Sequence, residues 1–158
     1  MTKGEETQPN RFFVDSTILR LGKWLRLLGL DAPFYHPGQE LPERSLLLTK
    51  RRMGHGNTNN LAVFVPFEHI EDQLKWFVHR FPEVIQPEKF GTRCALCNEP
   101  LVFITKEEAR ERVPDYIAQT HETFRMCPAC KRIYWKGSHM NRMRTFLEHI
   151  FSYHRGIP

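Results

Sequence analysis

The chain has 158 residues, of which 41% are hydrophobic and 26% charged, and its formal net charge is +5. A chain of this length can bury one hydrophobic core and carry a small additional module. No apolar run approaches the roughly 18–20 residues that a membrane-spanning helix needs. Residues 1–10, MTKGEETQPN, lack the apolar stretch of a secretory signal. We therefore expect residues 1–10 to be a disordered lead-in and the protein to be cytoplasmic, with no membrane partner.

Four short apolar segments predict the strands of one sheet. They are RFFV (11–14), a segment at about 31–36, SLLLT (45–49) and LAVFVP (61–66). A basic turn and a loop rich in glycine and asparagine, RRMGHGNTNN (51–60), separate the last two strands.

Three segments carry apolar residues at helical spacing. The first begins at Ser16 and ends before Gly29, because glycine commonly follows the last turn of a helix. The second covers 70–81, and the last covers about 143–153. Apolar strands that alternate with amphipathic helices indicate an α/β fold built on a mostly parallel sheet.

All cysteines of the chain lie in two Cys-x-x-Cys pairs, in RCALCN (93–98) and in CPACKRIYW (127–135). A reducing compartment disfavours lasting disulfides, and neither pair opens a helix beside a βαβ unit as a redox pair would. Tetrahedral zinc prefers four soft donors, and each pair supplies two thiolates from one tight turn. We therefore predict a structural Zn²⁺ site with the ligands Cys94, Cys97, Cys127 and Cys130. Such a closed site leaves no position for a catalytic water.

These patterns divide the chain into four parts. We expect a lead-in over 1–10, an α/β domain over 11–90, a zinc ribbon over 91–140, and a C-terminal helix over 141–158 that packs on the α/β domain.

Basic residues gather in two places in the first half of the chain. The first expected helix carries Arg20, Lys23 and Arg26, and the turn after SLLLT carries Lys50, Arg51 and Arg52. Such clusters are usually the solvated faces of a basic protein. The alternative is a phosphate-binding surface, on which these side chains would neutralise the backbone charge of RNA.

Asp15 ends the first strand at the edge where parallel sheets bind ligands. It has two interpretations. As a structural residue it is the N-cap of the helix that opens at Ser16, since aspartate is among the commonest N-caps. As a functional residue it is a carboxylate that faces the ligand crevice and can hold Mg²⁺ or Mn²⁺.

Several motifs in order carry a family resemblance. They are VDSTILRLGKWLRLLGLD (14–31), LLLTKR (46–51), HIEDQL (69–74), and the two cysteine pairs with the following YWKGSH (134–139). The chain resembles the PIN-like RNase family named for the C-terminal domain of the Mut-seven exonuclease. The resemblance covers about 11–150 and implies a PIN-like α/β sheet, a zinc ribbon, and metal-dependent cleavage of RNA.

The chain departs from that family at the acidic site. Metal-dependent cleavage needs several carboxylates around one or two hard cations, and Arg51 stands where the family's Leu-Thr-Arg-Asp segment has its aspartate. HPGQELPER (36–44) is too short for the expected crossover helix, but it offers Glu40 and Glu43 as substitutes. The candidate catalytic residues are therefore Asp15, Glu40 and Glu43, with Mg²⁺ or Mn²⁺ required only if the site is active.

Two classes of function follow from this mixture. The first is a metal-dependent ribonuclease in which Asp15 is the main metal ligand. The second is a non-catalytic protein that binds single-stranded RNA, or a protein-interaction scaffold, and that keeps the fold, the ribbon and the basic surface. The number of carboxylates gathered near Asp15 distinguishes the two classes.

Overall fold

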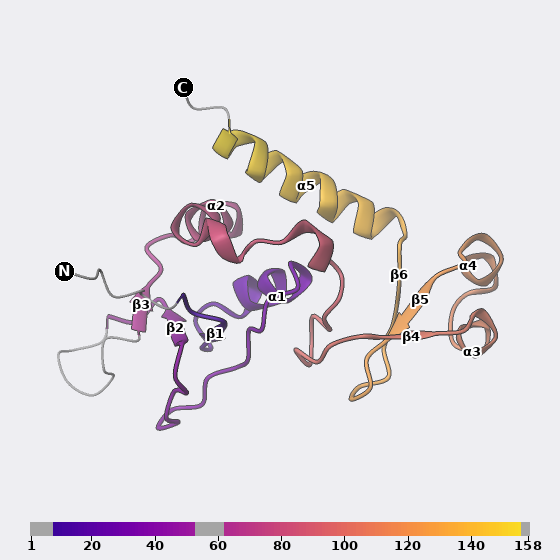
Figure 1. Cartoon of the computed structure of the whole chain (residues 1–158), viewed down its shortest axis with the longest axis horizontal. Helices are drawn as coiled ribbons and strands as arrows, with labels where there is room; N and C mark the ends of the chain where they lie inside the picture. The colour runs from indigo at the N-terminus through magenta and orange to yellow at the C-terminus, as the bar shows by residue number, and fades with distance from the viewer. Residues whose placement is uncertain (1–7, 53–61, 156–158) are drawn as a thin grey trace, which may run out of the picture.

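Three short parallel strands form the sheet of the N-terminal half of the molecule (Figure 1). The computed structural model describes residues 8–52 and 62–155. Within them the sheet has the order β1 (Arg11–Val14), β2 (Ser45–Thr49) and β3 (Ala62–Phe64).

The strands predicted at 11–14 and 45–49 are confirmed with these bounds. β3 falls within the segment predicted at 61–66, whose first residue lies outside the described part of the chain. Phe12 is paired with Leu46 in the parallel register between β1 and β2. The sheet is thus the α/β layer that the sequence predicted, and it is parallel throughout its three strands.

The segment predicted as a strand at 31–36 lies beside β1 but forms only a single parallel bridge, between Val14 and Phe34. The backbone N–H of Tyr35 donates to the Val14 carbonyl over 2.8 Å, and Val14 in turn donates to the Pro33 carbonyl over 3.0 Å. Proline has no N–H, so Pro33 cannot extend the ladder. The segment therefore lies where the strand was predicted, but it does not form a regular strand.

Helix α1 (Leu19–Leu27) covers the sheet and begins three residues later than Ser16. The residues before it form a turn, in which the Ile18 N–H donates to the Asp15 carbonyl over 3.3 Å. At its end the Leu30 N–H donates to the Leu25 carbonyl, and the Gly29 N–H donates to the Arg26 carbonyl. This pair of bonds is a Schellman motif, which places the residue after the C-cap in the left-handed region. Gly29 has φ +85°, as that motif requires.

Helix α2 (Ile70–Arg80) packs its apolar stripe into the main core, which confirms the helix predicted over 70–81 to within one residue. Its Phe77 meets Phe12 of β1 edge to face, with the ring centroids 5.0 Å apart. Two short 3₁₀ turns, η1 (Pro82–Val84) and η2 (Pro87–Lys89), then lead to the second half of the chain.

A separate antiparallel sheet carries the cysteine pairs. Its order is β4 (Val102–Ile104), β5 (Phe124–Met126) and β6 (Ile133–Trp135). β5 and β6 flank the second cysteine pair and pair antiparallel, as the two strands of a hairpin.

Two short helices between β4 and β5 were not predicted. They are α3 (Lys106–Arg110) and α4 (Asp115–Thr120). Thr105 and Glu108 form a capping box that starts α3. Both helices pack on a small core of their own, which includes Ala109, Ile117 and Phe124.

The last helix, α5 (Ser138–Arg155), runs from the ribbon back across α2 (Figure 1). It begins five residues before the predicted start at 143, because its apolar stripe toward the core begins only at Met143. Leu147 and Ile150 belong to the same buried cluster as Phe12. The predicted packing of the C-terminal helix against the first half therefore has direct contacts, although the four-part division itself stays a prediction.

Parts of two sequence predictions fall on residues that the structure does not describe. The lead-in predicted over 1–10 lies mostly in residues 1–7, and the loop predicted over 51–60 lies mostly in residues 53–60. Among the described residues, no helix is both long and apolar enough to cross a membrane.

Candidate metal centre and nucleic-acid interface

The four cysteines meet at one point of the ribbon. Their sulfur atoms all lie within 4.8 Å of one another. The Sγ atoms of Cys94 and Cys130 are 3.8 Å apart, far beyond the roughly 2.05 Å of a disulfide. Cys94 and Cys127 are fully buried, whereas Cys130 is exposed at the edge. Four sulfur donors in such a group are suited to a tetrahedral metal such as zinc.

The first knuckle (residues 94–97) and the second knuckle (residues 127–130) have the same local structure. In the first, the Asn98 N–H donates to the Cys94 carbonyl over 3.0 Å, and in the second the Lys131 N–H donates to the Cys127 carbonyl over 2.9 Å. Asn98 and Lys131 have φ of +66° and +64°. Each Cys-x-x-Cys pair is thus closed by a left-handed residue, which turns both of its sulfurs toward the same point.

Tyr134 of β6 supports the first knuckle through its hydroxyl group. That hydroxyl accepts from the Ala95 N–H at 3.3 Å and lies 3.1 Å from the Cys94 Sγ. Burial alone would raise the pKa of Cys94, but hydrogen bonds from Tyr134 and from the Cys97 and Leu96 N–H groups lower it to about 7. Burial and the Cys94 sulfur raise the pKa of Tyr134, so its hydroxyl stays protonated and can donate.

The pKa values of Cys97 and Cys127 are instead raised. The pKa of Cys97 is raised to about 12, mainly by the hydrogen bond between Cys97 and Cys130, and further by burial and by the charges of the neighbouring sulfurs. Burial is the main cause of the raised pKa of Cys127. Thiolates this close repel one another, so holding all of them ionised together requires a cation.

Arg26 of α1 docks on the first knuckle instead of facing solvent. Its Nε donates to the Ala32 carbonyl over 2.8 Å. Its Nη1 donates to the carbonyls of Ala95 and Leu96, over 2.9 and 3.1 Å. Only 8% of Arg26 is exposed, and burial lowers the pKa of its guanidinium. The prediction that Arg26 contacts nucleic acid is therefore corrected, because its donors are held by the protein.

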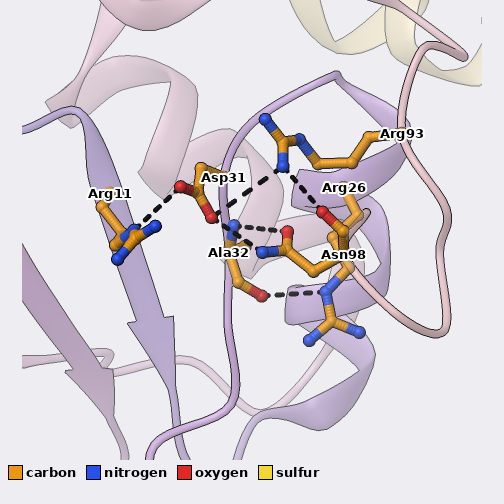
Figure 2. Close-up of polar contacts among 6 residues, drawn as sticks. All are labelled: Arg11, Arg26, Asp31, Ala32, Arg93 and Asn98. Carbon is orange, nitrogen blue, oxygen red and sulfur yellow. Dashed lines mark hydrogen bonds and ion pairs between the residues drawn. The ribbon is translucent and has the colours of Figure 1, made fainter. Parts of the chain in front are cut away.

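Asn98 and Asp31 belong to the same contact between the two halves, and Arg93 lies 4.0 Å from Asp31 Oδ1 (Figure 2). The Asn98 side-chain amide donates to Asp31 Oδ1 over 2.7 Å, and its oxygen accepts from the Ala32 N–H over 2.8 Å. Arg11 of β1 donates to Asp31 Oδ2 over 2.8 Å. Asn98 thus both closes the first knuckle and bonds the ribbon to the segment that lies beside β1.

Asp15 lies at the carboxyl end of β1 with only 8% of its surface exposed. Its Oδ1 accepts from the backbone N–H of Thr17 at 2.9 Å and also from the Thr17 hydroxyl. Its Oδ2 accepts from the Thr49 hydroxyl at 2.5 Å. The residue that flanks α1 is Ile18, with no side-chain cap, so the predicted N-cap role is wrong. Asp15 instead closes the turn before the helix and ties it to β2.

The same network holds the basic turn (residues 50–52). The Lys50 N–H donates to Thr17 Oγ1 over 2.9 Å, and the Arg51 N–H donates to Thr49 Oγ1 over 3.0 Å. Both threonine hydroxyls therefore accept from the basic turn and donate to Asp15. The carboxylate organises the backbone that presents Lys50 and Arg51.

A family comparison covers both the sheet and the ribbon. The family model described as the Mut7-C RNAse domain matches residues 10–147. The chain belongs to the Mut7-C RNase family. No curated protein and no solved structure matches the chain.

The predicted carboxylate set is not assembled in this Mut7-C chain. Among the described residues, the four cysteines are the only group of three or more potential ligands whose atoms lie within 4.8 Å of one another. Glu40 and Glu43 are exposed in the segment between Phe34 and β2. They do not join Asp15 in such a group. The position at which the resemblance implied an aspartate presents Arg51, whose Nη2 lies 3.3 Å from Ser16 Oγ.

The remaining predicted nucleic-acid residues differ in how accessible they are. Arg20, Lys23, Arg51 and Arg52 are exposed. Lys50 pairs with Glu68, which leaves 18% of its side chain exposed. The Arg52 guanidinium lies 5.8 Å from the Phe64 ring centroid of β3.

Sequence reasoning missed a polar hollow between the starts of α1 and α2. It has a volume of about 610 Å³ and is lined by Thr17 and Arg20 on one side and by Glu68, His69, Glu71 and Asp72 on the other. The motif HIEDQL contained the signal, since its acidic residues Glu71 and Asp72 lie in the first turn of a helix that packs beside α1. The hollow adjoins the turn closed by Asp15, so it belongs to the same end of the sheet.

Proposed function

We propose that this Mut7-C protein binds single-stranded RNA through a basic surface at the carboxyl end of its parallel sheet and cleaves it slowly or not at all. The observation that carries the proposal is the state of Asp15. Its oxygens accept hydrogen bonds from Thr17 and Thr49, and Arg51 occupies the neighbouring strand end.

The basic surface consists of Arg20, Lys23, Arg51 and Arg52, which are all exposed. Exposed guanidinium and ammonium groups neutralise phosphates and release counterions, which favours RNA binding without sequence preference. Arg26 is left out because it is buried. Lys50 contributes less because it pairs with Glu68.

Weak catalysis follows from the shortage of carboxylates. A cation held by Asp15 alone would have to keep most of its water shell, and substrate phosphates would have to complete the site. Arg51 opposes Mg²⁺ or Mn²⁺ by its charge and attracts phosphate instead. The competing function is a ribonuclease in which Glu40 or Glu43 assists Asp15 once RNA is bound.

The cysteine group serves as a structural zinc site in this proposal. Cys94, Cys97, Cys127 and Cys130 would hold Zn²⁺ as a closed tetrathiolate, which stabilises the ribbon and supplies no catalytic water. The close approach of their sulfurs supports this assignment. Zinc would then hold the first knuckle in the conformation that contacts Arg26, and the adjacent Asn98 in the position that contacts Ala32.

The test compares binding of a labelled single-stranded RNA to the wild-type protein, to Arg51→Ala and to Arg110→Ala over a range of salt concentrations. Arg110 is an exposed residue of α3 and controls for the loss of one positive charge. We expect affinity to fall steeply with salt, and the salt slope to flatten by about one unit in Arg51→Ala only. Equal behaviour of the two variants, or no RNA binding by the wild-type protein, would contradict the proposal.

A further inference from the structure

A pocket of about 440 Å³ lies between the antiparallel sheet and the start of α5, away from the basic turn. Its lining includes Phe103, Arg125, Trp135, Lys136, Met140 and Arg144. We call it the ribbon pocket. Its volume is within the range of small-molecule sites, which is roughly 300–1,000 Å³.

One wall of the ribbon pocket is a row of side chains across the sheet. Phe103 of β4 is the register partner of Arg125 on β5, and Arg125 is the partner of Tyr134 on β6. Side chains directly opposite one another share a face of a sheet. The neighbouring row, Ile104, Phe124 and Trp135, packs against the small core. The two rows lie on opposite faces of the sheet. Turning Phe103 toward the small core would therefore turn Ile104, Phe124 and Trp135 away from it.

Phe103 is 69% exposed, the most exposed of the large hydrophobic residues that the structure describes. The Arg125 guanidinium lies 4.7 Å from its ring centroid. Arg125 is itself held by a hydrogen bond of 2.8 Å from its Nη1 to the Gly91 carbonyl. The ring is thus supported on the side of Arg125, and most of its remaining area faces solvent. An exposed aromatic ring on a rigid support is a stacking platform for a base.

The charge of the ribbon pocket favours an anionic occupant. Arg125, Lys136 and Arg144 line it, and none of the described residues in its lining is acidic. Lys136 and Arg144 are exposed and are available to a phosphate. Thr123 and Asn141 also line it and offer side-chain donors and acceptors to a base edge.

We propose that the ribbon pocket binds one unpaired nucleotide of RNA, with the base stacked on Phe103 and the adjacent phosphate held by Lys136 and Arg144. This inference rests on the proposed RNA binding and adds a second contact to it. The basic turn at the sheet would hold the backbone, and the ribbon pocket would hold a base. Stacking of this kind tolerates every base, because each has an aromatic face.

The first experiment measures the affinity of a labelled single-stranded RNA for Phe103→Ala, Phe103→Tyr and Tyr116→Ala. Tyr116, on α4, is 66% exposed and does not line the pocket, so it is the matched control. Loss of one stacked base should weaken binding about tenfold in Phe103→Ala. Phe103→Tyr, which keeps the ring, and Tyr116→Ala should bind as the wild-type protein does. Lys136→Ala should flatten the salt slope by about one unit.

The second experiment isolates the pocket from the basic turn. The Trp135 indole N–H signal, assigned by its loss in Trp135→Phe, is followed by NMR during addition of adenosine monophosphate or of ribose 5-phosphate. We expect the base-containing probe to shift this signal and ribose 5-phosphate to shift it much less. Equal shifts would mean an anion site without stacking, and no shift with either probe would mean that the pocket takes another occupant, such as a protein segment. Either result overturns the proposal.

The two proposals can fail separately. If RNA binding is lost in Arg51→Ala and unchanged in Phe103→Ala, the ribbon pocket is not an RNA site, and the basic surface stands. If the wild-type protein binds no single-stranded RNA, the proposed function fails, and the RNA contact at the pocket fails with it.

Discussion

The guanidinium of Arg26 on α1 donates to the carbonyl of Ala95, 2.9 Å away, between the two cysteines of the first knuckle. The bond spans 69 positions of the chain. The buried Arg26 guanidinium therefore keeps all of its hydrogen-bond acceptors only while the knuckle keeps its folded conformation. Stability of the α1 region and stability of the metal centre should therefore be coupled.

Replacing Arg26 by methionine should lower the free energy of unfolding by on the order of 3 kcal/mol. The substitution keeps an unbranched apolar stem but leaves the Ala32, Ala95 and Leu96 carbonyls without their donor. An unsatisfied buried group such as the Ala32 carbonyl costs about 1–3 kcal/mol, and the partly buried Ala95 and Leu96 carbonyls cost less. Arg20→Met is the control, because Arg20 is an exposed residue of the same helix; its effect should stay within about 0.5 kcal/mol. Urea unfolding of both variants measures the difference, and similar midpoints would show that the Arg26 contacts contribute little.

Removing the metal should unfold the ribbon and loosen its contact with the sheet. Metal binding energy is folding energy in small zinc modules, so a strong chelator should abolish the β5–β6 pairing. Metal analysis of the purified protein should first give about one zinc per chain. In NMR spectra, amide signals of residues 91–137 should collapse on chelation, and the Ala32 amide should shift because it loses Asn98 as its acceptor. A metal-free, oxidised protein of equal stability would rule out the zinc site.

Substituting Gly29 should cost far more than substituting Gly38, although both glycines have a positive φ. At Gly29 (φ +85°) an added Cβ would lie 2.2 Å from the Lys89 carbonyl oxygen, whereas at Gly38 (φ +84°) it would meet nothing within 4 Å. Gly38→Ala should therefore lose only the backbone term of about 1 kcal/mol. Gly29→Ala should lower the free energy of unfolding by about 3 kcal/mol or more, since the backbone at Lys89 of η2 must move as well. Thermal unfolding of the two variants measures the difference. Equal melting temperatures would mean that the backbone at Lys89 moves at little cost in free energy.

Cleavage should be slow or absent in the wild-type protein and should increase when Arg51 is changed to aspartate. The substitution adds a second carboxylate at the strand end beside Asp15 and removes a charge that repels the cation. The assay follows a labelled single-stranded RNA with Mn²⁺. Asp15→Asn should abolish whatever metal-dependent cleavage exists, and Asp115→Asn, at an exposed position of α4, should not. Fast wild-type cleavage that survives Asp15→Asn would place the active site elsewhere.

The Asp15→Asn variant needs a stability measurement beside the cleavage assay. Asparagine has one acceptor oxygen where the carboxylate uses both, so the bond from Thr49 must be remade with the hydroxyl as acceptor. We expect a loss of about 1–2 kcal/mol and some disorder of the basic turn, whose amides bond to the same threonines. Reduced RNA binding by this variant would therefore not by itself indicate a lost metal ligand.

Local patterns predicted the strands and the cysteine group because each depends on neighbours in sequence. SLLLT is buried along nearly its whole length, and its continuous apolar character predicted a strand of the mostly parallel sheet. Each Cys-x-x-Cys pair closes on itself through one short turn. Predicting that the two pairs lie together required only the chemical preference of zinc for four sulfur ligands.

The role of Arg26 could not be predicted in this way. On α1 it lies beside the apolar stripe, where an arginine is normally solvated, and its burial comes from a loop contributed by the other half of the chain. The use of Asp15 was equally hidden, since its second oxygen is engaged by Thr49 of another strand. By contrast, α3 was predictable in principle, because Thr105 and Glu108 are spaced as a capping box.

The position of Leu147 and Ile150 in the same core as Phe12 has a consequence for the order in which the protein folds. During synthesis the strands and α1 emerge first, but the side chains that close their core come from the last helix. Domains usually fold as units as they leave the ribosome. Here the nascent N-terminal half must keep part of its apolar surface uncovered until α5 has emerged. Early folding of the ribbon would bring α5 back within reach of that surface.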